Sequence, residues 1–351
     1  MSEFVQETKQ NSDAATATNT AIHYLSTNGP TINEIHSGKR IHIANALKPV
    51  PLELHPFLHR LTDTHNHMCG FTTEEQSRFF CQRIENNISL PNFQDVLLAK
   101  QYMIVSTDQN DWNTFLNYEK NSSNNNIGNN HNRFIFGYGI HPMNAKHIDI
   151  QNFNWIDTLR TCLIQSPHSF VGEIGLDKGR HKASYQSHQI PIFVQQMSLA
   201  AELNRPVSIH SVKTDSALID LFDGMDKLPP ALTLHSYCGS LETWKRIVAV
   251  IDQKSIQHLE SKCELFIGLN CVTNLCKKDL STLLNGIGLD SILIETDFSV
   301  ADYPYDNANN RDISKLLLHA VEIIAHVFEE PYKVIVDTLV KNTERFLKSI
   351  V

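Results

Sequence analysis

Short hydrophobic runs alternate with longer amphipathic stretches along this chain from about residue 60 onward. Eight runs have the length and the β-branched or aromatic content that are typical of strands. In chain order they span residues 61–67, 103–108, 134–141, 170–177, 206–210, 232–237, 265–270 and 292–297. The 230 residues from His67 to Asp297 hold seven intervals of about 33 residues each. A βα unit of roughly 30 residues repeated eight times predicts an α/β protein folded as a (β/α)8 TIM barrel.

The stretches between these runs carry apolar residues at the three- and four-residue spacing of helices. Ile192–Leu203, 313–328 and 334–347 are predicted helices, and Pro191 suits the first turn of the first of them. An open, doubly wound sheet is the alternative fold, but it normally carries a glycine-rich phosphate loop after its first strand. Here residues 65–70 read HNHMCG, with a single glycine, which favours the barrel.

Two segments of low complexity flank or interrupt this pattern. Residues 1–59 are predicted to be a largely disordered N-terminal extension, because 1–35 are rich in Ser, Thr, Asn and Ala and have little apolar surface to bury. Residues 120–132 read KNSSNNNIGNNHN and are predicted to be an Asn-rich surface loop. Residues 60–351 are therefore expected to form the barrel domain.

The composition excludes several classes of protein. Of the 351 residues, 41% are hydrophobic, which is enough for a large core, and the net charge of −8 argues against coating nucleic acid by charge alone. No apolar run approaches the roughly 18 residues that cross a bilayer, and the N-terminus lacks the order of a secretory signal. The seven cysteines are scattered without a C-x-x-C pair. We expect reduced thiols and a location in the cytoplasm, the nucleus or both, without membrane attachment.

Ionisable residues recur at the carboxyl ends of the predicted strands, which converge on one mouth in a barrel. Asp63, His65 and His67 alternate along the first strand, and the two imidazoles form a ready platform for a divalent metal. Glu173 lies within an apolar strand, where a carboxylate is costly unless it is paired or bound to metal.

Three further strand ends supply His210, His235 and Asp297. Together these residues predict a two-metal hydrolase with a shared carboxylate. The first site would hold His65, His67, Glu173 and Asp297, and the second would hold Glu173, His210 and His235. Two divalent ions, Zn, Mn or Mg, would activate water as a metal-bound hydroxide and neutralise charge on a phosphoryl oxygen. Asp297 could also take a proton from the water, which makes Asp297 and Glu173 the candidate catalytic residues.

The order of these motifs resembles that of the TatD-related deoxyribonucleases. The matching pieces are DTHNH (63–67), GIHP (139–142), GEIGLD (172–177), RPVSIH (205–210), HSYCGS (235–240) and ETD (295–297), over roughly residues 60–351. The resemblance implies a metal-dependent hydrolase that cleaves phosphodiester bonds of DNA, often from an end. It also implies that His65, His67, Glu173, His210, His235 and Asp297 are metal ligands and that His141 lines the substrate pocket.

The chain departs from the family pattern around the expected substrate. The family continues I-H-S with Arg, whereas Ser211 is followed here by Val212 and Lys213, so Lys213 is the candidate substitute for a phosphate-binding fork. Ser240 is retained and is also expected to bind substrate. After Asp297 the usual A-P-Y-L is replaced by FSVA. The drift resembles that of fungal members, some of which are named for an interaction with a cell-cycle complex.

Three functional hypotheses follow from these observations. The first is a nuclease of exonuclease type whose partner is DNA or an oligonucleotide. The second is an amidohydrolase of a small molecule, although such barrels often bridge their metals with a carboxylated lysine, and the fourth strand here offers Glu173. The third is a non-catalytic interaction protein that retains the barrel and binds a protein partner through the N-terminal extension.

Overall fold

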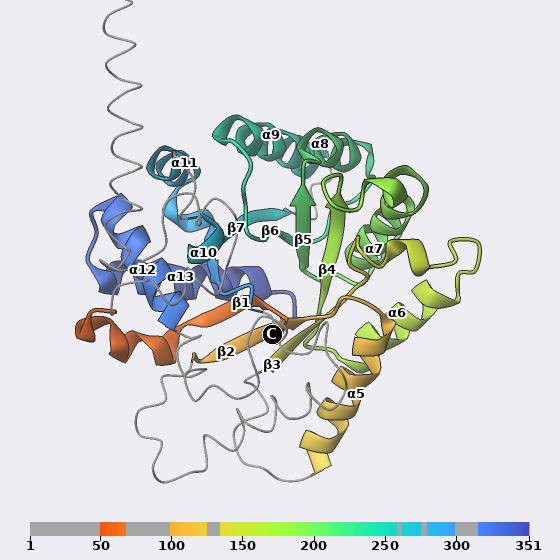
Figure 1. Ribbon diagram of the computed structural model, residues 1–351, viewed down its shortest axis with the longest axis horizontal. Helices are drawn as coiled ribbons and strands as arrows, with labels where there is room; N and C mark the ends of the chain where they lie inside the picture. Colours follow the sequence, from red (N-terminus) through yellow and green to blue (C-terminus); the bar gives the residue numbers. More distant parts are fainter. Residues whose placement is uncertain are drawn as a thin grey trace, which may run out of the picture.

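The computed structural model describes residues 50–67, 99–124, 134–257, 262–274, 279–298 and 315–350. Within these ranges eight parallel strands form one sheet, in which each strand lies beside its neighbours in the sequence (Figure 1). The strands are β1 (Thr62–Asn66), β2 (Gln101–Val105), β3 (Phe134–Tyr138), β4 (Phe170–Asp177), β5 (Val207–Val212), β6 (Ala231–Leu234), β7 (Glu264–Asn270) and β8 (Ile292–Glu295). Each predicted run overlaps one of them, although the ends of most runs differ from those of the strands, and the TIM barrel is confirmed.

The first and last strands are joined by hydrogen bonds that close the ring. The Asp297 amide donates to the His65 carbonyl at 3.0 Å. The Thr64 hydroxyl donates to the Ile294 carbonyl at 2.9 Å. The backbone amide and the hydroxyl of Thr296 donate to the buried carboxylate of Asp63 at 2.9 and 2.7 Å. Asp63, which the sequence placed on the same side as the two histidines, therefore fastens the seam between β1 and β8.

Helices cover the outside of the barrel (Figure 1). They are α5 (Gln109–Asn124), α6 (Asn154–Gln165), α7 (Ile190–Glu202), α8 (Asp215–Gly224), α9 (Leu241–Gln257), α10 (Cys271–Asn274), α11 (Leu280–Ile287), α12 (Lys315–Phe328) and α13 (Tyr332–Leu347). Shorter helical turns are η1 (Leu52–Arg60), η2 (Ala145–His147), η3 (Lys182–Ser184), η4 (Tyr185–Gln189) and η5 (Leu289–Ser291). The helices predicted at 192–203, 313–328 and 334–347 correspond to α7, α12 and α13.

The segment before the first strand belongs to the packed part of the molecule. Leu54 and Leu58 of η1 are fully buried in the main hydrophobic core. Arg60 pairs with Asp337 of α13 at 2.6 Å. The described end of the expected N-terminal extension, residues 50–59, thus lies against the barrel, whereas residues 1–49 lie outside the described residues.

The expected Asn-rich loop is described only in part. Residues 120–124 form the end of α5, and residues 125–132 lie outside the described residues. No helix in the described ranges is long and apolar enough to cross a membrane.

A second hydrophobic cluster closes the amino-terminal end of the barrel. Side chains from the strands, among them Met103, Phe170 and Phe266, meet Phe346 and Ile350 from the last helix and its extension. The Phe346 and Phe266 rings make an edge contact with centroids 5.9 Å apart. This apolar floor leaves the opposite end of the strands free for polar side chains.

Candidate metal centre

The ionisable side chains predicted from the sequence gather at the carboxyl end of the barrel. His65 lies in β1, Glu173 in β4 and His210 in β5. The others come from the segments that leave the strands, as His67 follows β1, His141 follows β3, His235 follows β6 and Asp297 follows β8. All except His210 are at least nine-tenths buried. Burial of so many polar groups together requires that each finds a partner or an ion.

Glu173 is the centre of this cluster. Its Oε1 atom lies 2.8 Å from His210 Nδ1, 2.8 Å from His235 Nε2 and 3.4 Å from His141 Nε2. His210 Nδ1 and His235 Nε2 are themselves 3.2 Å apart. One carboxylate oxygen therefore faces three imidazoles from β3, β5 and β6.

The second oxygen of Glu173 faces the two histidines of the first strand. Its Oε2 atom lies 3.1 Å from His67 Nε2 and 3.4 Å from His65 Nε2. The Nδ1 atom of His65 is hydrogen-bonded to the hydroxyl of Ser208 at 2.9 Å, which directs Nε2 toward Glu173. The two oxygens of Glu173 thus separate the histidines into two groups.

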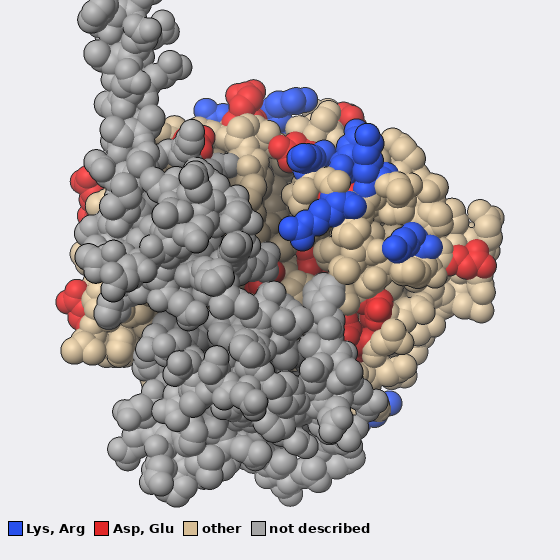
Figure 2. Space-filling view, in the orientation of Figure 1, with Lys and Arg blue, Asp and Glu red and all other residues tan. Residues whose placement is uncertain are grey.

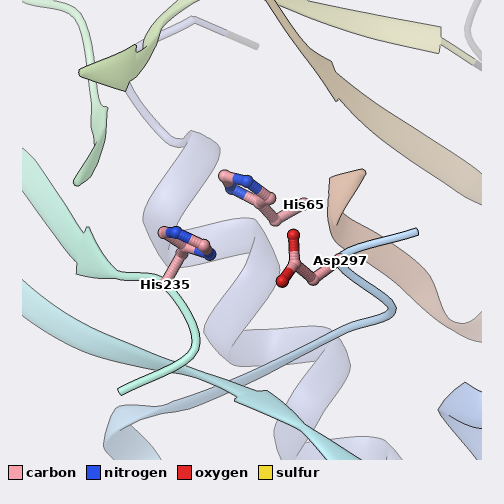
Figure 3. Close-up of side chains that lie close together, drawn as sticks. All are labelled: His65, His235 and Asp297. Carbon is pink, nitrogen blue, oxygen red and sulfur yellow. The ribbon is translucent and has the colours of Figure 1, made fainter. Parts of the chain in front are cut away.

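Asp297 lies on the first-strand side of the cluster. Its Oδ1 atom is 3.7 Å from His67 Nε2. Figure 3 shows its carboxylate beside the rings of His65 and His235, which stack with centroids 4.0 Å apart and an interplanar angle of 6°. The structure therefore brings together the six expected ligands and His141. Their individual roles as ligands stay predictions.

Three sets of side chains offer ligand atoms close enough to share an ion. They are His65, His67 and Glu173; His65, His235 and Asp297; and His141, Glu173 and His210. The resemblance assigns His141 to the substrate pocket, and the structure places it beside Glu173 and His210. His235 lies between the expected sites, since it contacts Glu173 and also stacks on His65.

Backbone conformation places these side chains where the strands end. Gly175 of β4 has a φ of 151° and pairs with His210, and a Cβ atom at Gly175 would lie 2.1 Å from the His210 carbonyl oxygen. β4 and β5 can approach this closely only with glycine at that position. Ser236 and Asp297 have φ values of 46° and 48°, left-handed conformations that are costly for such residues.

Glu295 is a buried residue whose role the sequence did not reveal. Its Oε1 atom accepts hydrogen bonds from the Ser236 amide at 2.7 Å and the Ser236 hydroxyl at 2.9 Å, and it lies 3.5 Å from His235 Nδ1. Gly268 of β7 provides the space, because a Cβ atom there would lie 1.9 Å from Glu295 Oε2. The sequence showed Glu295 only as part of the ETD motif (295–297). Its partners on β6 and β7 could not be read from the pattern.

The two other expected substrate-binding residues lie away from Glu173. Lys213 is exposed, immediately after β5, with a φ of 58°. The hydroxyl of Ser240 accepts a hydrogen bond from the Thr243 amide at 3.0 Å and thereby caps the first turn of α9. Within the described residues, neither contacts the cluster around Glu173.

The carboxylates and imidazoles of the cluster shift one another's pKa values. Burial alone would raise the pKa of Glu173, but the imidazoles of His141, His235 and His65 together hold it well below its usual value. Burial alone would lower the pKa of His235, yet the carboxylates of Glu173 and Glu295 hold it well above its usual value. Burial lowers the pKa of His141 to about 4, and the carboxylate of Glu173 acts in the opposite direction.

The donor set fits divalent ions. His65 Nε2, Glu173 Oε2 and His210 Nε2 are buried atoms without a hydrogen-bond partner in the described part of the chain. Unpartnered imidazole and carboxylate lone pairs that converge in this way are the ligands of first-row divalent metals. A cation would replace the protons that the carboxylates favour on His210 and His235, whose pKa values are raised.

A model of the TatD related DNase family matches residues 62–348. The chain belongs to this family. The match includes all eight strands and every member of the cluster. Relatives in the family include nucleases and a metal-dependent hydrolase from Methanocaldococcus jannaschii, and these support hydrolase chemistry for the chain.

Individual relatives are distant. Cut9-interacting protein scn1 from Schizosaccharomyces pombe is 25% identical in an alignment of 241 residues, and the match covers 55% of this chain and 67% of that protein. The 3'-5' RNA nuclease TATDN2 from Homo sapiens is 25% identical over 59% of this chain but only 26% of its own length. The 3'-5' ssDNA/RNA exonuclease TatD from Yersinia pseudotuberculosis is 29% identical over 45% of this chain and 55% of its own length.

A solved structure supports the fold. The TatD homolog YJJV from Escherichia coli has a TM-score of 0.57 at 21% identity, with 82% of this chain and 98% of that chain covered. At this identity the likeness concerns the barrel alone.

Proposed function

We propose that this protein is a divalent-metal-dependent nuclease that cleaves phosphodiester bonds of DNA from an end. The observation that carries the proposal is the position of Glu173, whose two oxygens face different histidine sets at the open end of the barrel. A carboxylate shared in this way favours two ions, one on each side. His65, His67 and Asp297 would hold the first ion with Glu173, and His210, His235 and His141 surround the second position.

Divalent ions bound here would supply Lewis-acid activation of water and of a phosphoryl oxygen. The protein's own residues would set the geometry of that reaction. Asp297 Oδ1 is the proposed acceptor of the proton from the attacking water. The apolar floor excludes solvent from the amino-terminal end of the barrel. The hydrogen bonds of His65 with Ser208 and of Glu295 with Ser236 orient these side chains before substrate binds.

Names of relatives support a polynucleotide substrate, since two of them are described as 3'-5' nucleases. One is named for RNA and the other for both single-stranded DNA and RNA, so an assay must offer both polymers. The fungal relative that is named for an interaction supports the alternative of a non-catalytic binding protein.

The test is hydrolysis of oligonucleotides labelled at the 5' or the 3' end, with Zn, Mn or Mg added to the purified full chain. We expect stepwise shortening from one end, stopped by chelation and by Asp297→Asn. His59→Ala, a substitution at an exposed residue of η1, serves as the control that keeps activity. Cyclic amides assayed in parallel test the amidohydrolase alternative. A protein that binds metal and cleaves neither DNA nor RNA would contradict the proposal.

A further inference from the structure

The loop that follows β4 carries a group of exposed cations beside the candidate metal centre. Lys178 and Arg180 lie in this loop, Lys182 begins η3, and Lys213 follows the neighbouring strand β5; we call these four residues the basic rim. The last paired positions of the two strands are Asp177 and Val212, so Lys178 and Lys213 leave the sheet side by side. Figure 2 shows Lys and Arg side chains gathered around the ends of β4 and β5, next to a recess.

The side chains of the basic rim have no acidic partner among the described residues, while Asp177 and Asp215 flank the two segments that carry them. None of its four residues forms an ion pair with a carboxylate of the described residues. The sequence contains no Asp or Glu from residue 178 to residue 190 or from residue 207 to residue 214. In a protein with a net charge of −8, such a local excess of positive charge attracts an anionic ligand toward this end of the barrel.

Hydrogen bonds hold the loop of the basic rim in one conformation. Asp177 Oδ1 accepts from the amides of Gly179 and Arg180 at 2.7 and 2.9 Å, and the Lys178 amide donates to the Val212 carbonyl at 2.9 Å. The buried side chain of Gln189 donates to the His181 carbonyl at 2.7 Å. A fixed backbone reduces the entropy lost when the exposed side chains bind a ligand.

The same aspartate connects the loop to the candidate metal centre. Asp177 Oδ2 lies 3.7 Å from His210 Nε2, while Oδ1 of that carboxylate holds the amide of Arg180. Asp177 therefore contacts both the loop that carries Arg180 and the imidazole of His210. A polymer with a phosphate on every unit could place one phosphate at the metal centre and its neighbours along the rim.

We propose that the basic rim is the binding track for the phosphate backbone of a single-stranded polynucleotide whose end enters the metal centre. The proposal rests on the nuclease function proposed above. It adds the residues that bind the phosphates of the polymer beyond the bond that is cleaved. Lys and Arg without a pairing acid suit phosphate, and contacts of this kind are independent of base sequence. The family pattern has an arginine after the I-H-S motif that could bind phosphate, and this chain lacks it. The basic rim would bind phosphate in its place.

The test measures binding rather than cleavage, so that its outcome does not depend on catalysis. The full chain, with metal chelated, is titrated with a labelled single-stranded oligonucleotide at several salt concentrations. In the variant Lys178→Gln/Arg180→Gln/Lys182→Gln we expect the slope of log affinity against log salt to decrease by about 2, given about 0.7 per phosphate contact. At 50 mM salt the affinity should fall on the order of tenfold to a hundredfold.

The matched control is Lys262→Gln/Lys341→Gln/Lys348→Gln, which removes the same charge from exposed residues. Lys262 precedes β7, and Lys348 lies between the floor residues Phe346 and Ile350, at the amino-terminal end of the barrel. A third variant that exchanges Lys and Arg within the rim keeps the charge and should keep the affinity, with melting curves to verify folding.

Equal slopes for the wild type and the rim variant, or an equal loss in the control variant, would overturn the proposal. Absence of any oligonucleotide binding by the wild type would overturn it as well. A protein that binds through the rim and never cleaves would contradict only the nuclease function.

Discussion

At the scale of single residues, Glu173 determines how the histidines are arranged. Its side chain is about 1% exposed, and five imidazole nitrogens lie within 3.4 Å of its oxygens. The sequence could indicate that a carboxylate in an apolar strand needs a partner. It could not show which oxygen faces which histidine, because that depends on side-chain rotamers set by packing across five strands.

Glu173→Gln tests this central position. The amide keeps the volume but loses the charge and one acceptor oxygen, so affinity for divalent metal should fall by at least about 100-fold and hydrolysis should fall with it. Metal content by mass spectrometry of the dialysed protein and oligonucleotide cleavage are the two measurements. Glu202→Gln, at the exposed partner of Arg160, is the control and should retain metal. Full metal content in Glu173→Gln would contradict a shared ligand.

Asp111 supplies a prediction about pH that is independent of the metal centre. Burial raises its pKa to about 6, although its carboxylate accepts hydrogen bonds from the Thr107 amide and hydroxyl. Between about pH 4 and pH 6 the folded protein therefore binds more protons at this residue than the unfolded chain does. The free energy of unfolding should fall as pH rises through this window, by at most about 1.4 kcal/mol per pH unit from this group.

The measurement is urea unfolding at intervals from pH 4 to pH 7. In Asp111→Asn the contribution of this residue disappears, so the free energy of unfolding should decline less over the window than in the wild type. Asp223→Asn, at an exposed position of α8, should leave the wild-type profile intact. Parallel profiles for the wild type and Asp111→Asn would show that the raised pKa is wrong.

At the scale of elements, the strand pattern predicts most of the fold. The eight runs recur at the spacing of a βα repeat, and each overlaps one strand of the barrel. The ends are less predictable: the run 103–108 corresponds to β2 at Gln101–Val105. The pattern does not predict contacts between neighbouring strands. The carboxylate of Glu295 on β8 occupies the space beside Gly268 on β7, and this contact depends on the register of the two strands.

Gly268→Ala tests the contact between these two strands. The new methyl group would occupy the position of Glu295 Oε2, displace that carboxylate and release Ser236 beside His235. We expect a loss of about 1–3 kcal/mol in the free energy of unfolding and weaker metal binding. Calorimetry with and without added metal measures both effects. Gly224→Ala is the control, because a Cβ atom there meets nothing within 4 Å, and a similar loss in it would refute this explanation.

At the scale of the whole molecule, stability and chemistry occupy opposite ends of the barrel. The floor is built from apolar side chains such as Met103, Phe170 and Phe346, and Phe346 is completely buried. The ionisable groups gather at the other end. This division explains how a single core can include buried charges without losing its hydrophobic support.

Phe346→Ala should therefore lower stability while it spares the metal centre. Loss of a buried aromatic ring costs about 3–5 kcal/mol, so the melting temperature should drop markedly. Below that temperature the metal content should equal that of the wild type. Phe153→Ala removes a ring that is 59% exposed and should change the melting temperature little. Loss of metal from folded Phe346→Ala would show that floor and centre are coupled.

The seam between β1 and β8 also affects when the protein can become active during its synthesis. His65 leaves the ribosome more than two hundred residues before Asp297, yet in the folded protein the Asp297 amide donates to the His65 carbonyl and the two side chains lie together. A nascent chain that has released seven strands displays imidazoles but lacks this aspartate. The group of side chains around Glu173 is thus complete only after the eighth strand has been synthesised.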